Sequence, residues 1–272
     1  MMDVDMISVL MFILGAIVGS FLNVCIVRMP HGKSVIYPSS HCVHCQKAIA
    51  WYDNIPFVSY ILLGGRCRLC KGRISFRYFL VELITAATFF VFYQYFGLTG
   101  VLSAYLVMTC GFIVATFVDF AHRIIPDEIS LGGIAAGLLF SFLLPELHGV
   151  RVGSQGIWLH LQSLGLSVLG VLVGGGIIYL MGILGDFMFK KESMGGGDIK
   201  LMAMVGAFLG WKLAILTFFL APFFGAVYGI IEKIRTKDTA IAYGPFLVLG
   251  ALISLFGGDA ILGWILSGYG LY

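Results

Sequence analysis

The stretch that decides the fold is LMAMVGAFLGWKLAILTFFLAPFFGAVYGII at 201–231, where Lys212 is the one charged residue. As a single helix it would be about 46 Å long, whereas the hydrocarbon core of a bilayer is roughly 30 Å thick. Gly210, Trp211 and Lys212 near its middle are typical of an interfacial turn with an aromatic anchor. The stretch therefore predicts two membrane passes, the first of them short, with Pro222 inside the second.

The composition of the rest of the chain also indicates a membrane protein. Of 272 residues, 60% are hydrophobic and 11% are charged, and the mean hydropathy is +0.99. A soluble domain needs about a quarter charged residues. Further apolar blocks predict spans at about 6–27, 78–97, 101–118, 129–145, 158–184 and 245–267. We expect an all-α polytopic membrane protein with about eight transmembrane helices. The net charge of +3 is too small to indicate a nucleic-acid partner.

The orientation follows from the basic residues in short loops. The segment 28–77 carries eight Lys and Arg residues against the single acid Asp53, which predicts that it is cytoplasmic. The start MMDVDMISVL has no basic residue, so the first apolar block is a retained span with the N-terminus outside. The basic residues around Lys190-Lys191 and Lys233–Lys237 then also lie inside, but the second group does so only if 201–231 crosses twice.

Two C-x-x-C pairs in the segment 28–77 predict a metal site. The first is Cys42 and Cys45, the second is Cys67 and Cys70, and 21 residues separate the pairs. Four thiolates complete the tetrahedral shell that zinc prefers and leave no open position, so the zinc is expected to be structural. The alternative is two disulfides, which need an oxidising compartment.

Other histidines and cysteines are secondary candidates. His41 and His44 could each replace a thiolate as a ligand. Cys25 and Cys110 lie in apolar blocks and are interpreted as small buried side chains.

Asp119 and Asp198 are the acids whose positions point to chemistry. Each lies at the cytoplasmic end of a predicted span, so they can meet although 79 residues separate them. Two close carboxylates share a proton, and one can then activate water while the other polarises a carbonyl. The alternative is that Asp119 pairs with Arg123 and Asp198 with Lys200 as interfacial anchors.

Three further acids have other interpretations. Glu82 lies about one turn into its span and could pair with Arg77, bridge to another span or serve a second activity. Asp127 follows a proline and is predicted in the first turn of a helix, where the helix dipole favours an acid. Asp186 is predicted to be a solvated loop residue.

Five motifs together resemble those of bacterial type IV prepilin peptidases, the membrane aspartyl proteases with a GxGD signature. Besides the paired C-x-x-C they are GSFLNVCIVRMP at 19–30, RYFLVELITA at 77–86, DFAHRIIPDEIS at 119–130 and GGGDIKLMAMVGAFLGW at 195–211. They occur in the family's order over nearly the whole chain. The resemblance divides the chain into a first helix (1–27), a cytoplasmic zinc-binding loop domain (28–77) and a protease core (78–272).

The resemblance implies the activity and the residues that carry it. Asp119 and Asp198 occupy the positions of the catalytic aspartates. The family cuts the basic leader from type IV prepilins and pseudopilins at the cytoplasmic face of the bacterial inner membrane. Many members also methylate the new N-terminal residue with S-adenosylmethionine. Asn23 and Glu82 are the candidate contacts for that methyl donor or the methyl-transfer region, although Asn23 could instead join helices. The sequence contains no G-x-G-x-x-G motif after a strand that would indicate a dinucleotide-type cofactor fold.

Two other functions are compatible with these residues. A related GxGD protease could act on membrane helices that are not pilins. A transporter could use the acids as a proton path and the zinc module as a binding site for a partner, but acids at membrane surfaces rather than at mid-bilayer argue against that function.

Overall fold

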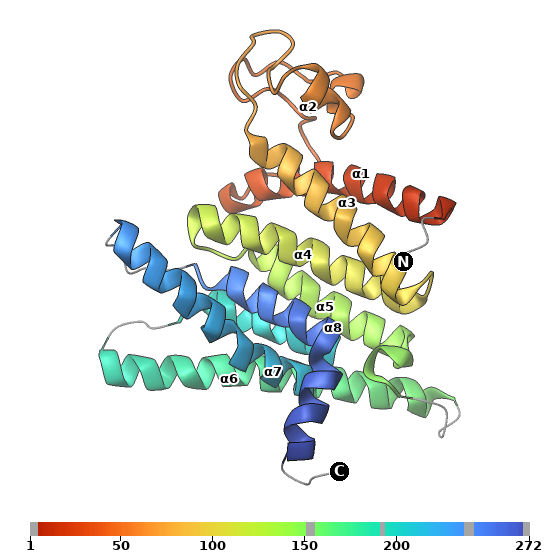
Figure 1. The fold of residues 1–272 in the computed structure, drawn as a ribbon, viewed down its shortest axis with the longest axis vertical. Coiled ribbons are helices and arrows are strands. Elements are labelled where there is room, and N and C mark those ends of the chain that lie inside the picture. Colours follow the sequence, from red (N-terminus) through yellow and green to blue (C-terminus); the bar gives the residue numbers. More distant parts are fainter. Residues whose placement is uncertain (1–4, 151–155, 191–193, 237–241, 269–272) are drawn as a thin grey trace. The chain divides into compact units, whose positions relative to one another are not determined.

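Every regular element in the described part of the chain is a helix (Figure 1). The structure is a computed structural model, and it describes residues 5–150, 156–190, 194–236 and 242–268. Asp3, Lys191 and Lys237, which entered the predicted orientation, lie outside these residues. The long helices are α1 (Met6–Arg28), α3 (Phe76–Phe96), α4 (Gly100–His122), α5 (Asp127–Leu143), α6 (Ile157–Phe189), α7 (Gly196–Thr236) and α8 (Gly244–Gly268). The short ones are η1 (Met29–His31), η2 (Trp51–Asn54), α2 (Val58–Leu62) and η3 (Pro145–His148).

The helices confirm a multi-pass membrane protein. Among the described residues, 6 helices are long and apolar enough to cross a bilayer, namely α1, α3, α4, α6, α7 and α8. Helix α5 has 17 residues, a length of about 26 Å, which is close to the thickness of the hydrocarbon core. The predicted eight passes count α5 and both arms of α7 as well, and that number stays a prediction.

Helix α7 does fold back at the predicted place. Gly210 has φ 76° and ψ 172°, which is not a helical conformation. A Cβ added to Gly174 of α6 would overlap the Met202 carbonyl oxygen and lie 3.5 Å from the Ala214 Cβ. In one straight helix, residues 202 and 214 would be about 18 Å apart. The two arms of α7 therefore lie side by side against α6.

Polar side chains support the break in α7. The Ala207 carbonyl, three residues before the break, accepts a hydrogen bond of 2.7 Å from the Ser167 hydroxyl. The His148 side chain also hydrogen bonds to the Ala207 backbone, and burial lowers the pKa of His148 to about 4. At neutral pH His148 is therefore uncharged and can lie half-buried beside Gly210.

The contacts divide the chain into two compact units, Met1–Val114 and Ala115–Tyr272, each described here by itself. In the first unit α1 and α3 pack antiparallel. A Cβ added to Gly15 would lie 2.8 Å from the Ala86 Cα, and one added to Gly19 would lie 2.8 Å from the Glu82 Cα. This close approach is possible because glycine has no side chain.

In the second unit, α5 and the first arm of α7 run parallel, since Gly133 contacts Met204 and Gly137 contacts Ala207. Helix α6 runs antiparallel to that arm. It comes so close at Gly170 and Gly206 that a Cβ on either glycine would overlap the other's backbone. The N-termini of α5 and α7 therefore lie at one end of this unit.

One predicted detail is wrong. Asp186 is not in a loop: α6 continues to Phe189, and the Asp186 carbonyl accepts a backbone hydrogen bond of 2.9 Å from Lys190. Its side chain is exposed, as expected, because a charged residue in the last turn of a helix can still face solvent. Asp127 is confirmed in the first turn of α5.

Candidate functional site

The four cysteines lie on two turns with the same backbone pattern. In each turn the N–H of the first cysteine donates to the carbonyl five residues later, Cys42 to Lys47 (3.0 Å) and Cys67 to Gly72 (2.9 Å). The residue four positions after the first cysteine has φ 58° in one turn and 56° in the other. Each turn thus directs two thiols to the same side, as the C-x-x-C spacing predicted.

The four sulfur atoms form one cluster that could hold a metal ion. All four Sγ atoms lie within 4.8 Å of one another, and those of Cys42 and Cys70 are 3.7 Å apart. A tetrahedron with Zn–S bonds of about 2.3 Å has an edge of about 3.8 Å. The cysteines are free thiols in the structure, which contradicts the alternative of two disulfides.

The two neighbouring histidines point away from the cluster. A ring nitrogen of His41 lies 3.1 Å from the Ser39 carbonyl oxygen, and one of His44 lies 3.1 Å from the Arg73 carbonyl oxygen. Each histidine thus hydrogen bonds to backbone. The cluster comprises the four predicted cysteines without a histidine.

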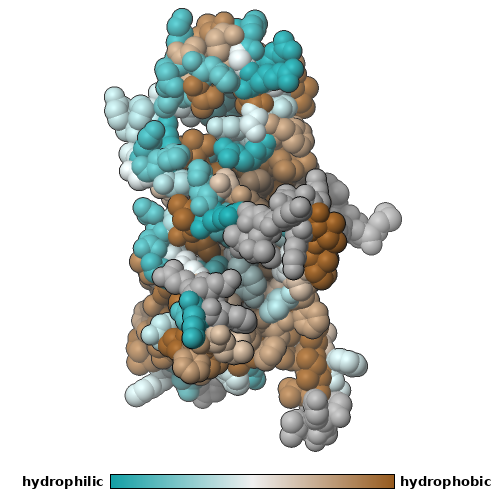
Figure 2. Space-filling view, turned by 90° about the vertical axis from the view of Figure 1, so that its left-hand side faces the viewer, coloured by the Kyte–Doolittle hydropathy of each residue, from teal (hydrophilic) through white to brown (hydrophobic). Residues whose placement is uncertain are grey.

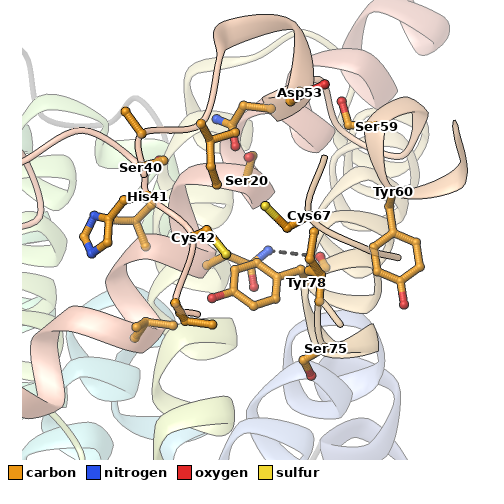
Figure 3. Close-up of a pocket in the computed structure, with 18 of the residues that line it drawn as sticks. Ser20, Ser40, His41, Cys42, Asp53, Ser59, Tyr60, Cys67, Ser75 and Tyr78 are labelled. Atoms are coloured by element: carbon orange, nitrogen blue, oxygen red, sulfur yellow. Dashed lines mark hydrogen bonds between the residues drawn. The ribbon is translucent and has the colours of Figure 1, made fainter. Parts of the chain in front are cut away.

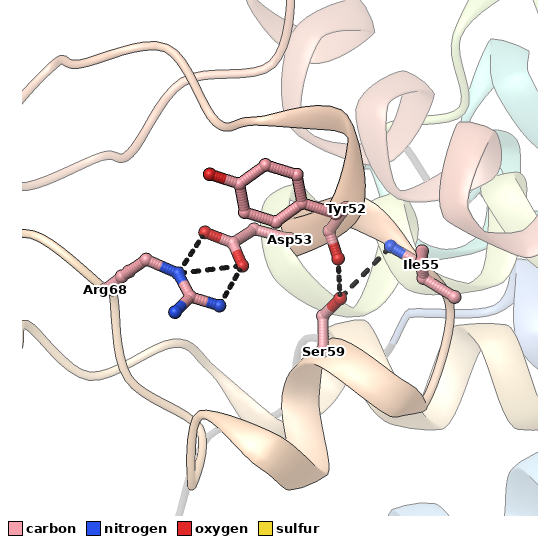
Figure 4. Close-up of polar contacts among 5 residues, drawn as sticks. All are labelled: Tyr52, Asp53, Ile55, Ser59 and Arg68. Carbon is pink, nitrogen blue, oxygen red and sulfur yellow. Dashed lines mark hydrogen bonds and ion pairs between the residues drawn. The ribbon is translucent and has the colours of Figure 1, made fainter.

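A polar brace holds the loop between the two turns (Figure 4). Arg68 pairs with Asp53 through two guanidinium nitrogens, at 2.7 and 2.8 Å, and this lowers the pKa of Asp53. The Ser59 hydroxyl donates to the Tyr52 carbonyl and accepts from the Ile55 N–H. The loop from η2 to α2 is therefore fixed to the second cysteine turn.

The module surface is mainly hydrophilic, with apolar side chains among the polar ones. In Figure 2 the hydrophilic colour gathers at the top, where Figure 1 shows the module. Trp51, Ile36 and Leu62 are nevertheless strongly exposed.

A cavity of about 1040 Å³ lies between this module and the adjoining ends of α1 and α3 (Figure 3). Its lining includes Asn23 of α1 and Glu82 of α3, the two residues predicted to serve methyl transfer. Its volume is at the upper end of the range of small-molecule sites, about 300–1,000 Å³. The structure thus brings both predicted residues to one cavity.

Asn23 joins the two helices, as one of its two interpretations predicted. Its Nδ2 donates to the Gly19 carbonyl at 3.3 Å and to the Tyr78 carbonyl at 3.0 Å. Its Oδ1 is buried without a protein partner. A purely structural role accounts for the nitrogen of this amide but not for its oxygen.

Glu82 is buried and bridges to the module. Its Oε2 accepts a hydrogen bond of 3.0 Å from the Phe57 N–H, and its carboxylate also hydrogen bonds to the Ser20 side chain of α1. Of the predicted alternatives, the structure therefore shows a bridge from α3 to α1 and to the loop.

Asp119 lies in the last turn of α4 and is 5% exposed. Its Oδ2 accepts a hydrogen bond of 2.9 Å from the backbone N–H of Gly244, the first residue of α8. A Cβ added to Gly244 would lie 2.8 Å from that oxygen. Residue 244 can therefore hold the carboxylate in this way only if it is glycine.

Asp198 lies in the first turn of α7, at the same end of the unit. A Cβ on Gly197 and one on Gly244 would each lie 3.1 Å from the Ile125 side chain, so the two glycines flank one residue. The charges of Asp119 and Asp198 are close enough to interact. Tyr243 lies near them, since burial and the Asp198 charge raise the pKa of Tyr243 to about 12.

The alternative pairing as interfacial anchors is only partly seen. In this alternative Lys200 would form an ion pair with Asp198. In the structure it pairs with Asp127 instead, with Lys200 Nζ 2.6 Å from Asp127 Oδ1. Arg123 interacts electrostatically with Asp119, whose Oδ2 nevertheless accepts the backbone hydrogen bond from α8.

Sequence reasoning missed three residues at these sites, namely Gly244, Tyr243 and Arg77 as a lining residue of the cavity. The Gly244-Pro245 dipeptide at the start of the last apolar block was the signal for the first. Of the remaining cysteines, Cys25 is buried as expected, whereas Cys110 is half-buried.

Comparison with known proteins agrees with this arrangement. Residues 13–96 match the model of the bacterial Peptidase A24 N-terminal domain, and residues 106–230 match the model of the type IV leader peptidase family. The chain belongs to the type IV leader peptidase family.

Several curated relatives are similar over most of the chain. A prepilin leader peptidase/N-methyltransferase of Myxococcus xanthus is 36% identical over 84% of this chain and 64% of its own length. The type 4 prepilin-like proteins leader peptide-processing enzyme of Escherichia coli is 34% identical over 89% of this chain and 91% of its own length. A prepilin leader peptidase/N-methyltransferase of Pseudomonas aeruginosa is 32% identical over 92% of this chain and 90% of its own length. No solved structure matches the chain.

Proposed function

We propose that this protein is a bifunctional prepilin peptidase that cleaves the leader of type IV prepilins and pseudopilins and N-methylates the new terminus. Asp119 and Asp198 are its catalytic aspartates. The observation that carries the peptidase assignment is that both acids lie at one end of the second unit, close enough for the charge of Asp119 to act on Asp198. Membership of the leader peptidase family supports the choice of substrate.

The surroundings of the two carboxylates suggest different roles for them. A backbone N–H that donates to a carboxylate stabilises its charged form. Because Gly244 donates to Asp119, Asp119 is the ionised base that activates water. Asp198 then holds the shared proton and polarises the scissile carbonyl. Tyr243, whose pKa is about 12, remains protonated beside them.

The four-cysteine cluster fits structural zinc. The sulfur spacing suits a tetrahedral ion, and four thiolates leave no position for substrate or water. Bound zinc would tie the two cysteine turns together and so fix the wall of the cavity that the module forms.

The cavity of the first unit fits the methyl-transfer site. S-adenosylmethionine supplies an activated methyl group on sulfur when it is bound. Asn23 and Glu82 are the residues that would hold the donor or the amine that receives the methyl group. Both offer oxygen acceptors, which suits ligands that carry N–H groups or positive charge.

The proposed location is the bacterial inner membrane, with the N-terminus outside and both sites facing the cytoplasm. The basic segment 28–77 supports this orientation. A cysteine cluster that binds zinc as thiolates also fits a reducing compartment. We retain the division into a first helix (1–27), a zinc-binding loop domain (28–77) and a protease core (78–272).

The test is incubation of the purified protein in detergent with a prepilin, followed by mass spectrometry. The wild-type protein removes the leader, and Asp119→Asn and Asp198→Asn do not. Cleavage by both variants would remove the peptidase assignment. A gain of about 14 mass units that requires S-adenosylmethionine identifies methyl transfer, and its absence would remove that activity alone.

A further inference from the structure

The Asn23 side chain lines the cavity and carries an oxygen acceptor that no protein group uses. Its Nδ2 faces two backbone carbonyls, of Gly19 and Tyr78. Turning the amide over would place Oδ1 against both of those acceptors, so the orientation is fixed. Oδ1 is therefore left without a donor in a residue that is 2% exposed and lines the cavity. A buried polar atom in this state strongly favours a ligand donor.

An unused donor lies close by on α3. The Nε of Arg77 is buried without a hydrogen-bond partner, and Arg77 lines the same cavity. Arg77 directly precedes Tyr78, whose carbonyl oxygen accepts a hydrogen bond from the Asn23 amide. Figure 3 shows Tyr78 at the cavity. The wall thus offers one unfilled acceptor and one unfilled donor at neighbouring positions.

Glu82 adds a negative charge one turn further along α3. Its carboxylate accepts hydrogen bonds from the Phe57 N–H and the Ser20 side chain, which are neutral donors. A carboxylate has about four lone-pair sites, so it can accept another N–H. The other acid that lines the cavity is Asp53, and it already pairs with Arg68.

The rest of the lining makes this position selective. Basic residues on the cavity wall include Arg28, Lys33, Lys47 and Arg73. They disfavour a positively charged group beside them, whereas the carboxylate of Glu82 attracts one. An amine is therefore expected at the α1–α3 seam.

We propose that Asn23, Glu82 and Arg77 bind an α-amino-acyl head, that is, an α-amine with a neighbouring carbonyl or carboxylate. The amine donates to Asn23 Oδ1 and to Glu82, and the carbonyl or carboxylate oxygen accepts from Arg77 Nε. This inference rests on the proposed methyl-transfer site and names the chemistry that the site recognises.

Two ligands carry such a head: the free N-terminus of a cleaved pilin and the amino-acid end of the methyl donor. Binding to the full-length protein in detergent separates them through two pairs of probes. S-adenosylhomocysteine is compared with methylthioadenosine, which lacks the amino-acid end. A short peptide that begins with phenylalanine is compared with its N-acetylated form.

We expect the wild-type protein to bind the member with the free amine about tenfold or more tightly in at least one pair. A preference within the nucleoside pair would show that the site binds the amino-acid end of the methyl donor. A preference within the peptide pair would show that it binds the N-terminus of the cleaved pilin, which accepts the methyl group. Glu82→Gln and Asn23→Leu should each reduce this preference to about twofold or less. Glu128→Gln is the matched control, since it makes the same change at an exposed residue outside the cavity and should retain the preference.

Equal binding within both pairs by the wild-type protein would overturn the inference, and so would an unchanged preference in Glu82→Gln. Zinc content and melting temperature check that the variants fold. Because Asn23→Leu also removes the bonds to Gly19 and Tyr78, the nearly isosteric Glu82→Gln keeps the test decisive. If the protein methylates its substrate but shows no preference for the free amine, only this inference is contradicted. If it prefers the free amine but transfers no methyl group, only the proposed methyltransferase activity is contradicted.

Discussion

The two units of this protein make polar sites in a membrane protein in different ways. In Met1–Val114 the candidate site is a cavity, and most of its wall comes from the segment between α1 and α3, which four cysteines and an ion pair hold. In Ala115–Tyr272 the candidate site consists of two acids at helix ends, and glycines bring the backbone against them. The first site has room for a sizeable small ligand, whereas the second holds its carboxylates by close backbone contact.

This difference teaches how each site should respond to change. Loops without a regular core depend on cross-links, so the cavity should depend on the metal. Where helix ends pack closely through glycine there is no room for an added atom, so a single added methyl group should impair the aspartate site. The following predictions test this contrast, from the largest expected effect to the smallest.

Replacing either aspartate should nearly abolish cleavage. Asp119→Asn or Asp198→Asn removes a group that must carry or exchange a proton, and we expect cleavage to fall by about 10³-fold or more. Quantitative mass spectrometry of leader release measures this loss. Zinc content serves as the control, since the cysteines belong to the other unit. More than about a tenth of wild-type cleavage in either variant would contradict the dyad.

Replacing a cluster cysteine should remove the metal and loosen the first unit. Cys42→Ser or Cys67→Ser leaves three thiolates, and bound zinc should fall from about one ion per chain to a small fraction of that. Metal analysis and thermal unfolding measure the two effects. Cys110→Ser is the control because Cys110 is not in the cluster. Full zinc content in both cluster variants would show that the thiols serve another purpose.

A single methyl group at Gly244 should impair the peptidase. In Gly244→Ala the new Cβ would lie 2.8 Å from Asp119 Oδ2, and the carboxylate is the part that can shift. We expect kcat for cleavage to fall by about 10- to 100-fold with little change in KM. Gly257→Ala in the same helix is the control, since its Cβ would meet only the Ile261 side chain, at 3.7 Å. Equal activities would show that the Gly244 contact does not position Asp119.

Alanine substitutions at the two glycines before Asp198 should differ in their effect on the cleavage rate, by a smaller factor than the changes above. A Cβ on Gly197 would lie 3.1 Å from the Ile125 Cβ, whereas one on Gly196 would meet nothing within 4 Å. Gly197→Ala should therefore lower the cleavage rate by about threefold to tenfold. Gly196→Ala should be nearly neutral, or even stabilise α7 by about 0.5–1 kcal/mol because alanine favours helix. Rates and melting temperatures of the pair check this order, and equal effects would contradict it.

Much of the fold could be predicted because membrane spans are local features of sequence. The apolar blocks located the long helices to within a few residues at most ends, and the length of 201–231 predicted the break that Gly210 makes. The largest boundary errors were at the end of α6, predicted at 184 and found at Phe189, and at the two ends of α7, predicted at 201 and 231 and found at Gly196 and Thr236. They arose because polar residues near a membrane surface do not end a helix. The C-x-x-C pairs predicted the cluster because four thiols at this spacing have few other uses.

The candidate sites were only partly accessible to sequence reasoning. Asp119 and Asp198 could be paired because the topology placed both at one side of the membrane. Their surroundings could not be predicted, since Gly244 is 125 residues from Asp119 along the chain. Lys200 also found a different partner, Asp127, from the one that sequence proximity suggested.

The sequence by itself indicated the class of fold, the order of the spans, the cysteine cluster and the two candidate acids, because each of these depends on residue type and local spacing. The tertiary structure decided that a backbone N–H of α8 meets Asp119 and that the oxygen of Asn23, a residue of the cavity wall, has no hydrogen-bond partner. Both depend on which atoms of distant helices come within hydrogen-bond distance. Packing between helices sets those distances, and spacing along the chain does not.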